Sequence, residues 1–238
     1  MSNEIVNYNE QLAALAKRAT EVERPQGSTI GLRAGQLTYQ GSAVPGNKLD
    51  CIIIASTHAN LYYEDAYDPD KLSNPVCWAY AEEEGDLAPH PESSKPQHET
   101  CKGCPQNEFG SSTKGKGKAC KNSRHLVLIP ASTSVDDVPT AEMAVLKLPV
   151  TSVKNYGQYV QKCATLYSRP PLGVITTIST QPDAKSQFKV TFQSGELVAG
   201  ELIGPLLGKI ESAMSLLERV YDAPSQEATP AAGGKKKF

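Results

Sequence analysis

The feature that most constrains this chain is a long segment, residues 64–125, which shows neither helical nor strand periodicity but holds four of the six cysteines. Structureless segments of this length are uncommon in compact domains, and this one has too few apolar residues to build a core of its own. Its cysteines are Cys77, Cys101, Cys104 and Cys120. Clustered thiols are able to organise such a segment by holding a metal ion.

The spacing of these thiols predicts a structural zinc site. Cys101 and Cys104 form a C-x2-C pair, a turn that points two sulfurs at one ion. Cys77 and Cys120 would complete a tetrahedral set of four thiolates. Zinc contributes folding free energy of order ~10 kcal/mol in small zinc peptides, which is enough to order the segment. We therefore expect one structural Zn2+ in this insert.

Three histidines leave other ligand sets open. His90 and His98 lie in the same insert and His125 follows at its end, so any of them could replace one thiol. A redox C-x-x-C is disfavoured because it needs a helix N-terminus after a strand, whereas Pro105 follows Cys104 in a loop. A catalytic zinc is disfavoured because it would keep one coordination position open.

The stretch from Cys101 to Arg124 is strongly basic. One acid, Glu108, stands against six cations. The cations are Lys102, Lys114, Lys116, Lys118, Lys121 and Arg124. A metal at both ends of this stretch would fix the cations on one surface, and its glycines leave backbone N–H groups open to phosphate. The net charge of -2 argues against a uniformly basic nucleic-acid binder, but it allows a local basic patch.

Aromatic residues accompany the cations. Tyr62, Tyr63, Trp78 and Phe109 lie inside or next to the insert. Exposed rings beside cations are what sequence-tolerant binding of unpaired bases requires, at ~1–3 kcal/mol per stacked base. Tyr62 and Tyr63 are adjacent on a predicted strand and point to opposite faces, so only one of them could line a groove.

Outside the insert the sequence predicts a mainly β chain with flanking helices. We expect a helix within residues 1–27, strands on both sides of the insert, a helix over 153–167, a strand hairpin at 173–197, a final helix at 204–221 and a disordered tail at 223–238. This order suits a small barrel of the five-stranded oligonucleotide-binding type, with a core over 28–222 that a zinc-ribbon-like lobe interrupts at 64–125. Periodicity alone does not separate it from other small barrels.

The remaining composition is that of an ordinary globular protein. The longest apolar runs, such as CIIIA and LVLI, are too short to cross a bilayer, and the polar start MSNEIVNYNEQ lacks the order of a secretory signal. We expect a cytoplasmic protein with no membrane partner. In a reducing compartment thiols stay free or bind metal, and Cys51 and Cys163, in apolar surroundings, are expected to be buried.

Several stretches together resemble a known family. They are NLYYEDAYDPD, PVCWAY, CKGCPQNEFGS, GKGKACKNSRHLVL, LKLPVTSVKNYGQYV and GVITTISTQ. Over roughly residues 28–195 they are similar to bacteriophage single-stranded DNA-binding proteins in which a zinc-stabilised segment interrupts an oligonucleotide-binding barrel. The zinc-containing helix-destabilising protein of T4-type phages is a more remote architectural relative.

This resemblance implies a protein without enzymatic activity that coats single strands cooperatively during phage DNA replication and recombination. It implies zinc ligation by the four insert cysteines and phosphate contacts from the cations between Lys114 and Arg124. It also implies contacts with a polymerase, helicase or recombinase, self-association on DNA, and the host cytoplasm as the location. The family's tail is often acidic with a terminal phenylalanine, whereas this sequence ends in GGKKKF.

Two other functions stay open on sequence grounds. The zinc module could dock its basic loop on an acidic protein surface, as an interaction or transcription-modulating factor. A metal-dependent nuclease would use Glu64, Asp65, Asp68 and Asp70. Such acidic clusters are usually solvated turns, and no base or lysine is spaced here for a two-metal site.

Overall fold

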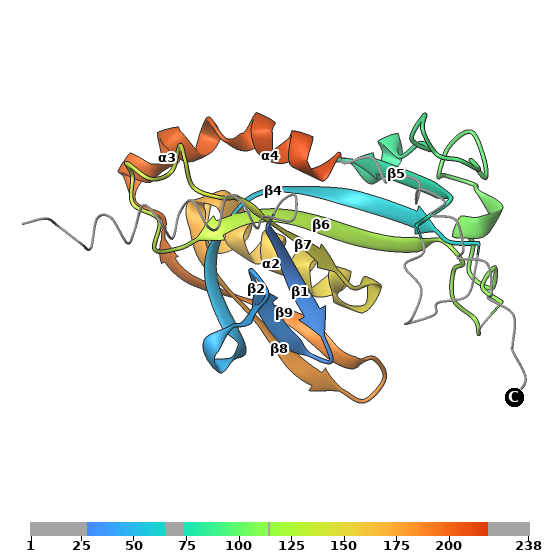
Figure 1. Cartoon of the computed structure of the whole chain (residues 1–238), viewed down its shortest axis with the longest axis horizontal. Coiled ribbons are helices and arrows are strands. Elements are labelled where there is room, and N and C mark those ends of the chain that lie inside the picture. The colour runs from blue at the N-terminus through green and yellow to red at the C-terminus, as the bar shows by residue number, and fades with distance from the viewer. Residues whose placement is uncertain (1–27, 65–73, 114, 219–238) are drawn as a thin grey trace, which may run out of the picture. The chain divides into compact units, whose positions relative to one another are not determined.

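The computed structural model describes residues 28–64, 74–113 and 115–218, so the predicted helix within 1–27 and the predicted tail at 223–238 lie outside the described residues. The described chain is mainly β, as expected, with a smaller share of helix (Figure 1). Its strands are β1 (Ser28–Arg33), β2 (Gln36–Tyr39), β3 (Ser42–Ala43), β4 (Lys48–Tyr62), β5 (Cys77–Ala81), β6 (Lys121–Pro130), β7 (Ala144–Leu148), β8 (Val174–Asp183) and β9 (Gln187–Leu197). Its α-helices are α2 (Val153–Tyr167), α3 (Gly200–Leu207) and α4 (Ile210–Leu217).

The chain divides into two compact units. Among the described residues, unit one contains 28–56 and His125–Leu216, and unit two contains most of Thr57–Arg124 together with residues 217 and 218. The chain passes from unit one to unit two within β4 and returns within β6. Most of unit two therefore corresponds to the insert of the sequence, extended by the end of β4 from Thr57 to Tyr62.

A curled, half-barrel sheet forms the framework of unit one. Its strand order is β3-β2-β1-β7-β6-β4-β8-β9, and β5 pairs with β4 off this path. β1 pairs with β7 in parallel, with Ile30 opposite Leu146, whereas β8 is antiparallel to β4 and β9. The β8–β9 hairpin confirms the strand pair predicted from its β-branched residues.

One face of the sheet and α2 enclose the main hydrophobic core. Ile53 of β4 and Leu128 of β6 point into it and are 2% exposed or less. Tyr159 and Cys163 enter it from α2, one helical turn apart, and the predicted helix over 153–167 is confirmed. Cys51 and Cys163 are both buried, as their apolar surroundings predicted.

The opposite face of β4 and β6 is also covered. Side chains alternate along a strand, so the neighbours of the core residues point outward. Ile52, Ile54, Val127 and Ile129 are nevertheless 5% exposed or less. In Figure 1, α3 and α4 lie along this side of the two strands, and Leu206 of α3 is fully buried. The helices therefore seal the outer face of these strands.

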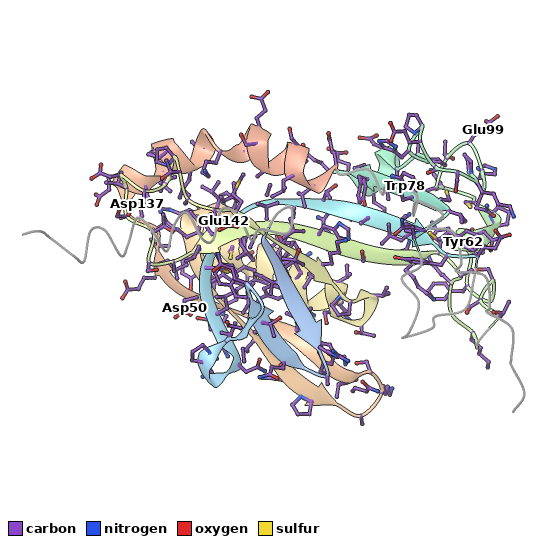
Figure 2. The ribbon with its side chains drawn as sticks, in the orientation of Figure 1. Asp50, Tyr62, Trp78, Glu99, Asp137 and Glu142 are labelled. Atoms are coloured by element: carbon purple, nitrogen blue, oxygen red, sulfur yellow. The ribbon has the colours of Figure 1, made fainter. Side chains whose placement is uncertain are left out.

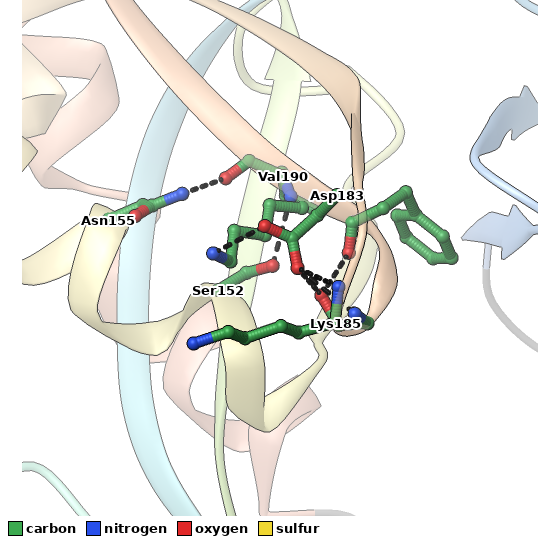
Figure 3. A network of polar contacts seen from close by, with 8 residues as sticks. Ser152, Asn155, Asp183, Lys185 and Val190 are labelled. Carbon is green, nitrogen blue, oxygen red and sulfur yellow. Dashed lines mark hydrogen bonds and ion pairs between the residues drawn. The ribbon is translucent and has the colours of Figure 1, made fainter.

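Side chains cap β9, the last strand in the order. The Val190 N–H donates to Ser152 Oγ at 2.9 Å, and Asn155 Nδ2 donates to the Val190 carbonyl at 2.8 Å (Figure 3). Both polar groups of Val190 are thus satisfied, by Ser152 just before α2 and by Asn155 within it.

A side chain also closes the β8–β9 turn. At the start of this turn, the Asp183 carboxylate accepts the N–H of Ser186 at 3.0 Å.

Two elements differ from the expectation. The final helix, predicted over 204–221, is instead the pair α3 and α4, which separate at Gly208. Pro205 lies inside α3 and removes a helical donor, and glycine is a poor helix former, so the helix breaks here. The insert, expected to be irregular, contains β5, which pairs with β4 so that Leu61 lies opposite Trp78.

Among the described residues no helix combines the length and the apolar character needed to cross a bilayer.

A single asparagine ties the first hairpin to β8. Asn47 adopts a φ of 56°, in the left-handed region that asparagine tolerates. Its Oδ1 accepts the Leu37 N–H at 2.7 Å, and its Nδ2 donates to the Gly35 carbonyl at 2.9 Å and to Thr180 Oγ1. Thr180 in turn donates to the Gly35 carbonyl.

We therefore expect Asn47→Ala to lower the free energy of unfolding by about 2 kcal/mol, because it removes these hydrogen bonds and strains the left-handed backbone. Asn47→Gly keeps the backbone conformation, so it should lower the free energy of unfolding by a smaller amount, about 1 kcal/mol. Urea denaturation of the two variants and the parent measures both values. Equal stability of Asn47→Ala and the parent would contradict this role.

Candidate metal and nucleic-acid site

The four cysteines of the insert meet at one cavity in unit two. Cys77 begins β5, Cys101 and Cys104 flank a tight turn, and Cys120 immediately precedes β6. All four line a cavity of about 20 Å3, and none forms a disulfide. A volume of this size holds about one water-sized particle. The structure therefore gathers four thiols, separated by up to 43 residues of sequence (77 to 120), around space for a single ion.

Local backbone geometry builds the C-x2-C turn. Gly103 has a φ of +79°, which a residue with a side chain rarely adopts, and this turns the chain between the two cysteines. The Cys104 carbonyl then accepts the Asn107 N–H at 2.8 Å. The Cys120 N–H donates to the Gln106 carbonyl at 2.8 Å, so the last cysteine is bonded to the turn that follows the pair.

An asparagine network surrounds the cavity and was not foreseen from the sequence. Asn122 Nδ2 donates to Asn60 Oδ1 at 2.6 Å and to Asn107 Oδ1 at 2.9 Å. Asn107 Nδ2 donates to the Cys101 carbonyl at 3.0 Å. The network links β4, the turn and β6, and so orients the thiol loops. Asn107 lies three residues after Cys104 in the stretch CKGCPQNEFGS, and its nearness to the C-x2-C pair is the one signal that could have pointed to it.

The pKa values of three of these thiols, Cys77, Cys101 and Cys120, are raised. Burial is the largest cause that raises the pKa of Cys77 and of Cys101, and the charges of neighbouring thiolates add to it. Burial, followed by the charges of Cys101, Cys77 and Cys104, raises the pKa of Cys120 to about 12. The four sulfurs thus lie within electrostatic reach of one another. They are unable to ionise together unless a cation compensates their charge.

The donor set fits zinc in chemistry, although the sulfurs do not converge at bonding distance. Within the described residues, no three or more His, Cys, Asp or Glu side chains are placed to hold a metal ion. The cavity walls, however, carry four sulfurs, one histidine and no carboxylate, which is the ligand type that zinc prefers and Ca2+ or Mg2+ does not.

The three histidines occupy different places. His98 lines the thiol cavity, and its Nδ1 lies 3.0 Å from the Thr100 carbonyl. His90 stacks on Trp78, with ring centroids 5.7 Å apart and an 18° angle between the planes. His125 is buried in unit one. Of the three, only His98 shares the cavity with the cysteines, so it is the histidine that could join or replace a thiol ligand.

The glycine- and lysine-rich loop between Cys104 and Cys120 closes on itself. The Gly110 N–H donates to the Gly117 carbonyl at 3.0 Å, and Ser111 Oγ accepts the Ala119 N–H at 2.9 Å. These bonds join the two arms of the loop. The loop therefore has a defined path on either side of Lys114, the predicted contact that lies outside the described residues.

Most of the predicted phosphate contacts in unit two are exposed. Lys102, Lys116 and Lys121 are exposed along the insert. Arg124 is half-buried and lies close enough to His58 to lower its pKa, after the larger effect of burial. The lysines are thus better placed than Arg124 to contact an anion in solution.

The predicted stacking residues differ sharply in exposure. Phe109 is 82% exposed, and the Lys118 ammonium lies 5.2 Å from the centre of its ring. Trp78 is only 3% exposed, so its ring has no open face for a base in this structure. Tyr62 and Tyr63 are half-buried, and Figure 2 shows Tyr62 and Trp78 in unit two. Phe109 is the ring best placed to receive a base.

The acidic cluster considered for a nuclease is only partly described. Glu64 forms an ion pair and hydrogen bond with Lys95. The other three acids, Asp65, Asp68 and Asp70, lie outside the described residues. The one described member is thus already engaged by a lysine.

No protein-family model, curated protein or solved structure matches this chain.

His125 gives unit one a defined acid sensitivity. Burial, and to a lesser degree the charge of Lys147, lowers the His125 pKa to about 3. Below pH ~6.5 the unfolded chain binds this proton and the folded chain does not, so stability is lost as the pH falls from ~6.5 towards ~3. Between pH 7 and pH 5 the loss from His125 should be about 2 kcal/mol.

Urea denaturation of the parent and of His125→Gln at both pH values checks this. Whatever the overall stability of the variant, its loss between the two pH values should be smaller than the parent's by about 2 kcal/mol. Parallel pH dependences would contradict the assignment.

Proposed function

We propose that this protein is a single-stranded DNA-binding protein without enzymatic activity, which coats single strands without reading their sequence. The basic insert in unit two is its main binding surface, and one structural zinc ion holds that surface in place. The expected context is phage DNA replication and recombination in the host cytoplasm. The expected partners are a polymerase, helicase or recombinase and further copies on the same strand.

One observation carries this proposal. The loop that leaves the thiol cavity at Cys104 and returns at Cys120 bears an exposed aromatic ring, Phe109, with a lysine ammonium against it. Stacking on an exposed ring and charge pairing with phosphates are the two interactions that bind any single strand, whatever its sequence. Both are present on a loop whose ends line the same cavity.

The order of the strands supports an oligonucleotide-binding barrel. In such a barrel the first strand lies between the second and the fourth, the fifth pairs with the fourth, and a helix commonly joins the third to the fourth. The order β7-β6-β4-β8-β9, with α2 between β7 and β8, has this arrangement. The insert then falls in the connection between the first two strands, one of the connections that bind ligands in these barrels.

Two departures move the binding surface towards the insert. β1 occupies the edge of β7 that the fifth strand would use to close the barrel. The outer face of β6, which such barrels commonly use for ligands, is sealed here, since Val127 and Ile129 are fully buried. A strand of DNA would have to displace this apolar packing to reach that face. The exposed cations of the insert require no such change.

Zinc, when bound, would supply the positive charge and the four bonds that close the insert. Cys77, Cys101, Cys104 and Cys120 would hold it, with His98 as the alternative to one thiol. Asn107 would fix the turn of the C-x2-C pair through its bond to the Cys101 carbonyl. The basic loop would then be presented as one surface rather than as a free chain.

Phe109→Ala should weaken binding to labelled oligo(dT) by roughly 5- to 100-fold, because it removes one stacking platform worth about 1–3 kcal/mol. Phe109→Trp should restore most of the affinity. Fluorescence anisotropy measures both constants, and thermal stability should not change because the ring is 82% exposed. Leu166→Ala, which truncates another exposed apolar side chain, should leave the affinity unchanged and serves as the control.

The same titration separates this function from its rivals. Affinity for oligo(dT) should fall steeply between 50 and about 200 mM salt and should exceed affinity for duplex. An oligo(dT) affinity that depends only weakly on salt, or a preference for duplex DNA, would contradict the proposal. A stoichiometric protein partner retained after nuclease treatment, without oligo(dT) binding, would favour the interaction module. Cleavage of DNA in Mg2+ or Mn2+ would favour the nuclease.

The zinc assignment predicts one zinc ion per chain by elemental analysis. The double variant Cys101→Ser, Cys104→Ser should lose the metal and most of the oligo(dT) affinity, because the insert depends on metal binding to fold. Cys163→Ala, which removes a thiol from the core of unit one, should keep the metal. Retention of both zinc and affinity in the double variant would refute the site. His98→Ala reports whether this histidine is a ligand.

A further inference from the structure

A groove runs along α2 in unit one, separate from the insert. Its volume is about 390 Å3, within the range of small-ligand sites. One wall is a single face of α2, formed by Asn155, Gln158, Tyr159 and Lys162. The other wall includes Gln181 of β8 and Phe192 of β9. From Asn155 to Lys162 the helix face is about 10 Å long.

The groove presents polar groups that the rest of the protein does not use. Gln158, Gln181 and Lys162 are exposed, and none of these three side chains forms a hydrogen bond or ion pair within the described part of the chain. Lys162 is the one cation of the lining, and no carboxylate lines the groove. The groove is therefore suited to an anionic ligand that also has hydrogen-bonding groups.

An aromatic wall completes the groove and is held in place. The half-buried ring of Phe192 packs edge-on against Tyr156 at 5.3 Å and stacks with Tyr159 at 5.7 Å, as centroid distances. The Tyr159 hydroxyl lies 2.6 Å from Thr176 Oγ1, which fixes this ring in turn. A ring that neighbours hold in one position loses little entropy when a planar ligand packs against it.

At Val190 the backbone edge beside the groove is not available for a peptide strand. Asn155 donates to the Val190 carbonyl, and the Val190 N–H donates to Ser152 (Figure 3). Addition of a strand needs unpaired backbone groups at the edge. With Val190 capped, the side chains of the groove are left as the recognition elements. Those side chains fit a small planar anion better than an extended peptide.

From these groups we infer that the groove takes one nucleotide of the bound single strand. Lys162 holds its phosphate, the base packs at Phe192, and the carboxamides of Gln158 and Gln181 meet the edge of the base. A carboxamide both donates and accepts, so it is able to pair with any base, in keeping with binding that ignores sequence. This inference rests on the proposed function and adds a second contact surface, on unit one.

Four substitutions on α2 test it in the full chain. Lys162→Ala and Gln158→Ala remove groove groups, whereas Lys154→Ala and Gln161→Ala remove the same groups from exposed positions of α2 that do not line the groove. Each groove variant should weaken oligo(dT) binding by about two- to tenfold, the range for one hydrogen bond or ion pair. Lys162→Ala should also lower the salt slope by about 0.7. Both controls should bind as the parent does.

The outcomes distinguish this groove from the proposed function. Equal losses from Lys162→Ala and Lys154→Ala would mean diffuse electrostatics and would overturn the inference. No loss from either groove variant, while Phe109→Ala still weakens binding, would overturn the inference and leave the proposed function standing. Failure of the parent to bind oligo(dT) would remove both. Chemical-shift changes along α2 with free dTMP, without any effect of the groove variants on oligo(dT), would assign a free-nucleotide site instead and would also overturn it.

Discussion

The fold of unit two brings four thiols together around one cavity, where their charges would oppose one another. Burial and mutual repulsion raise the pKa of Cys120 to about 12, so the cavity as it stands favours neutral sulfur. A divalent cation would reverse this preference, because each thiolate would then face a positive charge instead of other thiolates. The hydrophobic contribution here is small: apart from the cysteines, the large buried apolar side chains described in this unit are Leu61, Trp78, Leu87 and Leu217. On our proposal the metal supplies the folding energy that such a core lacks.

Two strands connect this polar unit to an apolar one. β4 and β6 are covered on both faces in unit one, where Ile52 and Val127 are as buried as the core residues next to them. Farther along, the same two strands carry Asn60 and Asn122, which bond to each other at 2.6 Å. The change from apolar to amide side chains therefore coincides with the passage from one unit to the other. Within unit two the strand ends supply hydrogen bonds that orient the thiol loops.

Local patterns in the sequence predicted more of this structure than long-range pairings did. The helix over 153–167 was predictable because its buried residues recur at helical spacing, and the hairpin after it was predictable from its β-branched residues. The cysteine spacing pointed to the cavity because chemistry restricts what clustered thiols do. The parallel pairing of β1 with β7 joins residues 116 positions apart (28 and 144), and no local pattern encodes it. The sequence also left open whether Trp78 is buried, because its cover comes from the chain around His90, which has no regular period.

The available contacts decide how a single-stranded DNA-binding protein of the proposed kind would divide its binding free energy between stacking and charge pairing. A dissociation constant of 1 μM corresponds to about 8 kcal/mol, whereas one stacked base contributes about 1–3 kcal/mol. Phe109 is the one strongly exposed ring among the described residues of unit two. Stacking on this ring alone therefore falls several kcal/mol short of the free energy that a 1 μM dissociation constant requires. The exposed lysines of the insert must then supply most of the remainder through release of counterions, which carries no sequence information. On this proposal the protein would bind any single strand and would depend on ionic strength for control. A further base contact along α2 would add affinity without adding specificity.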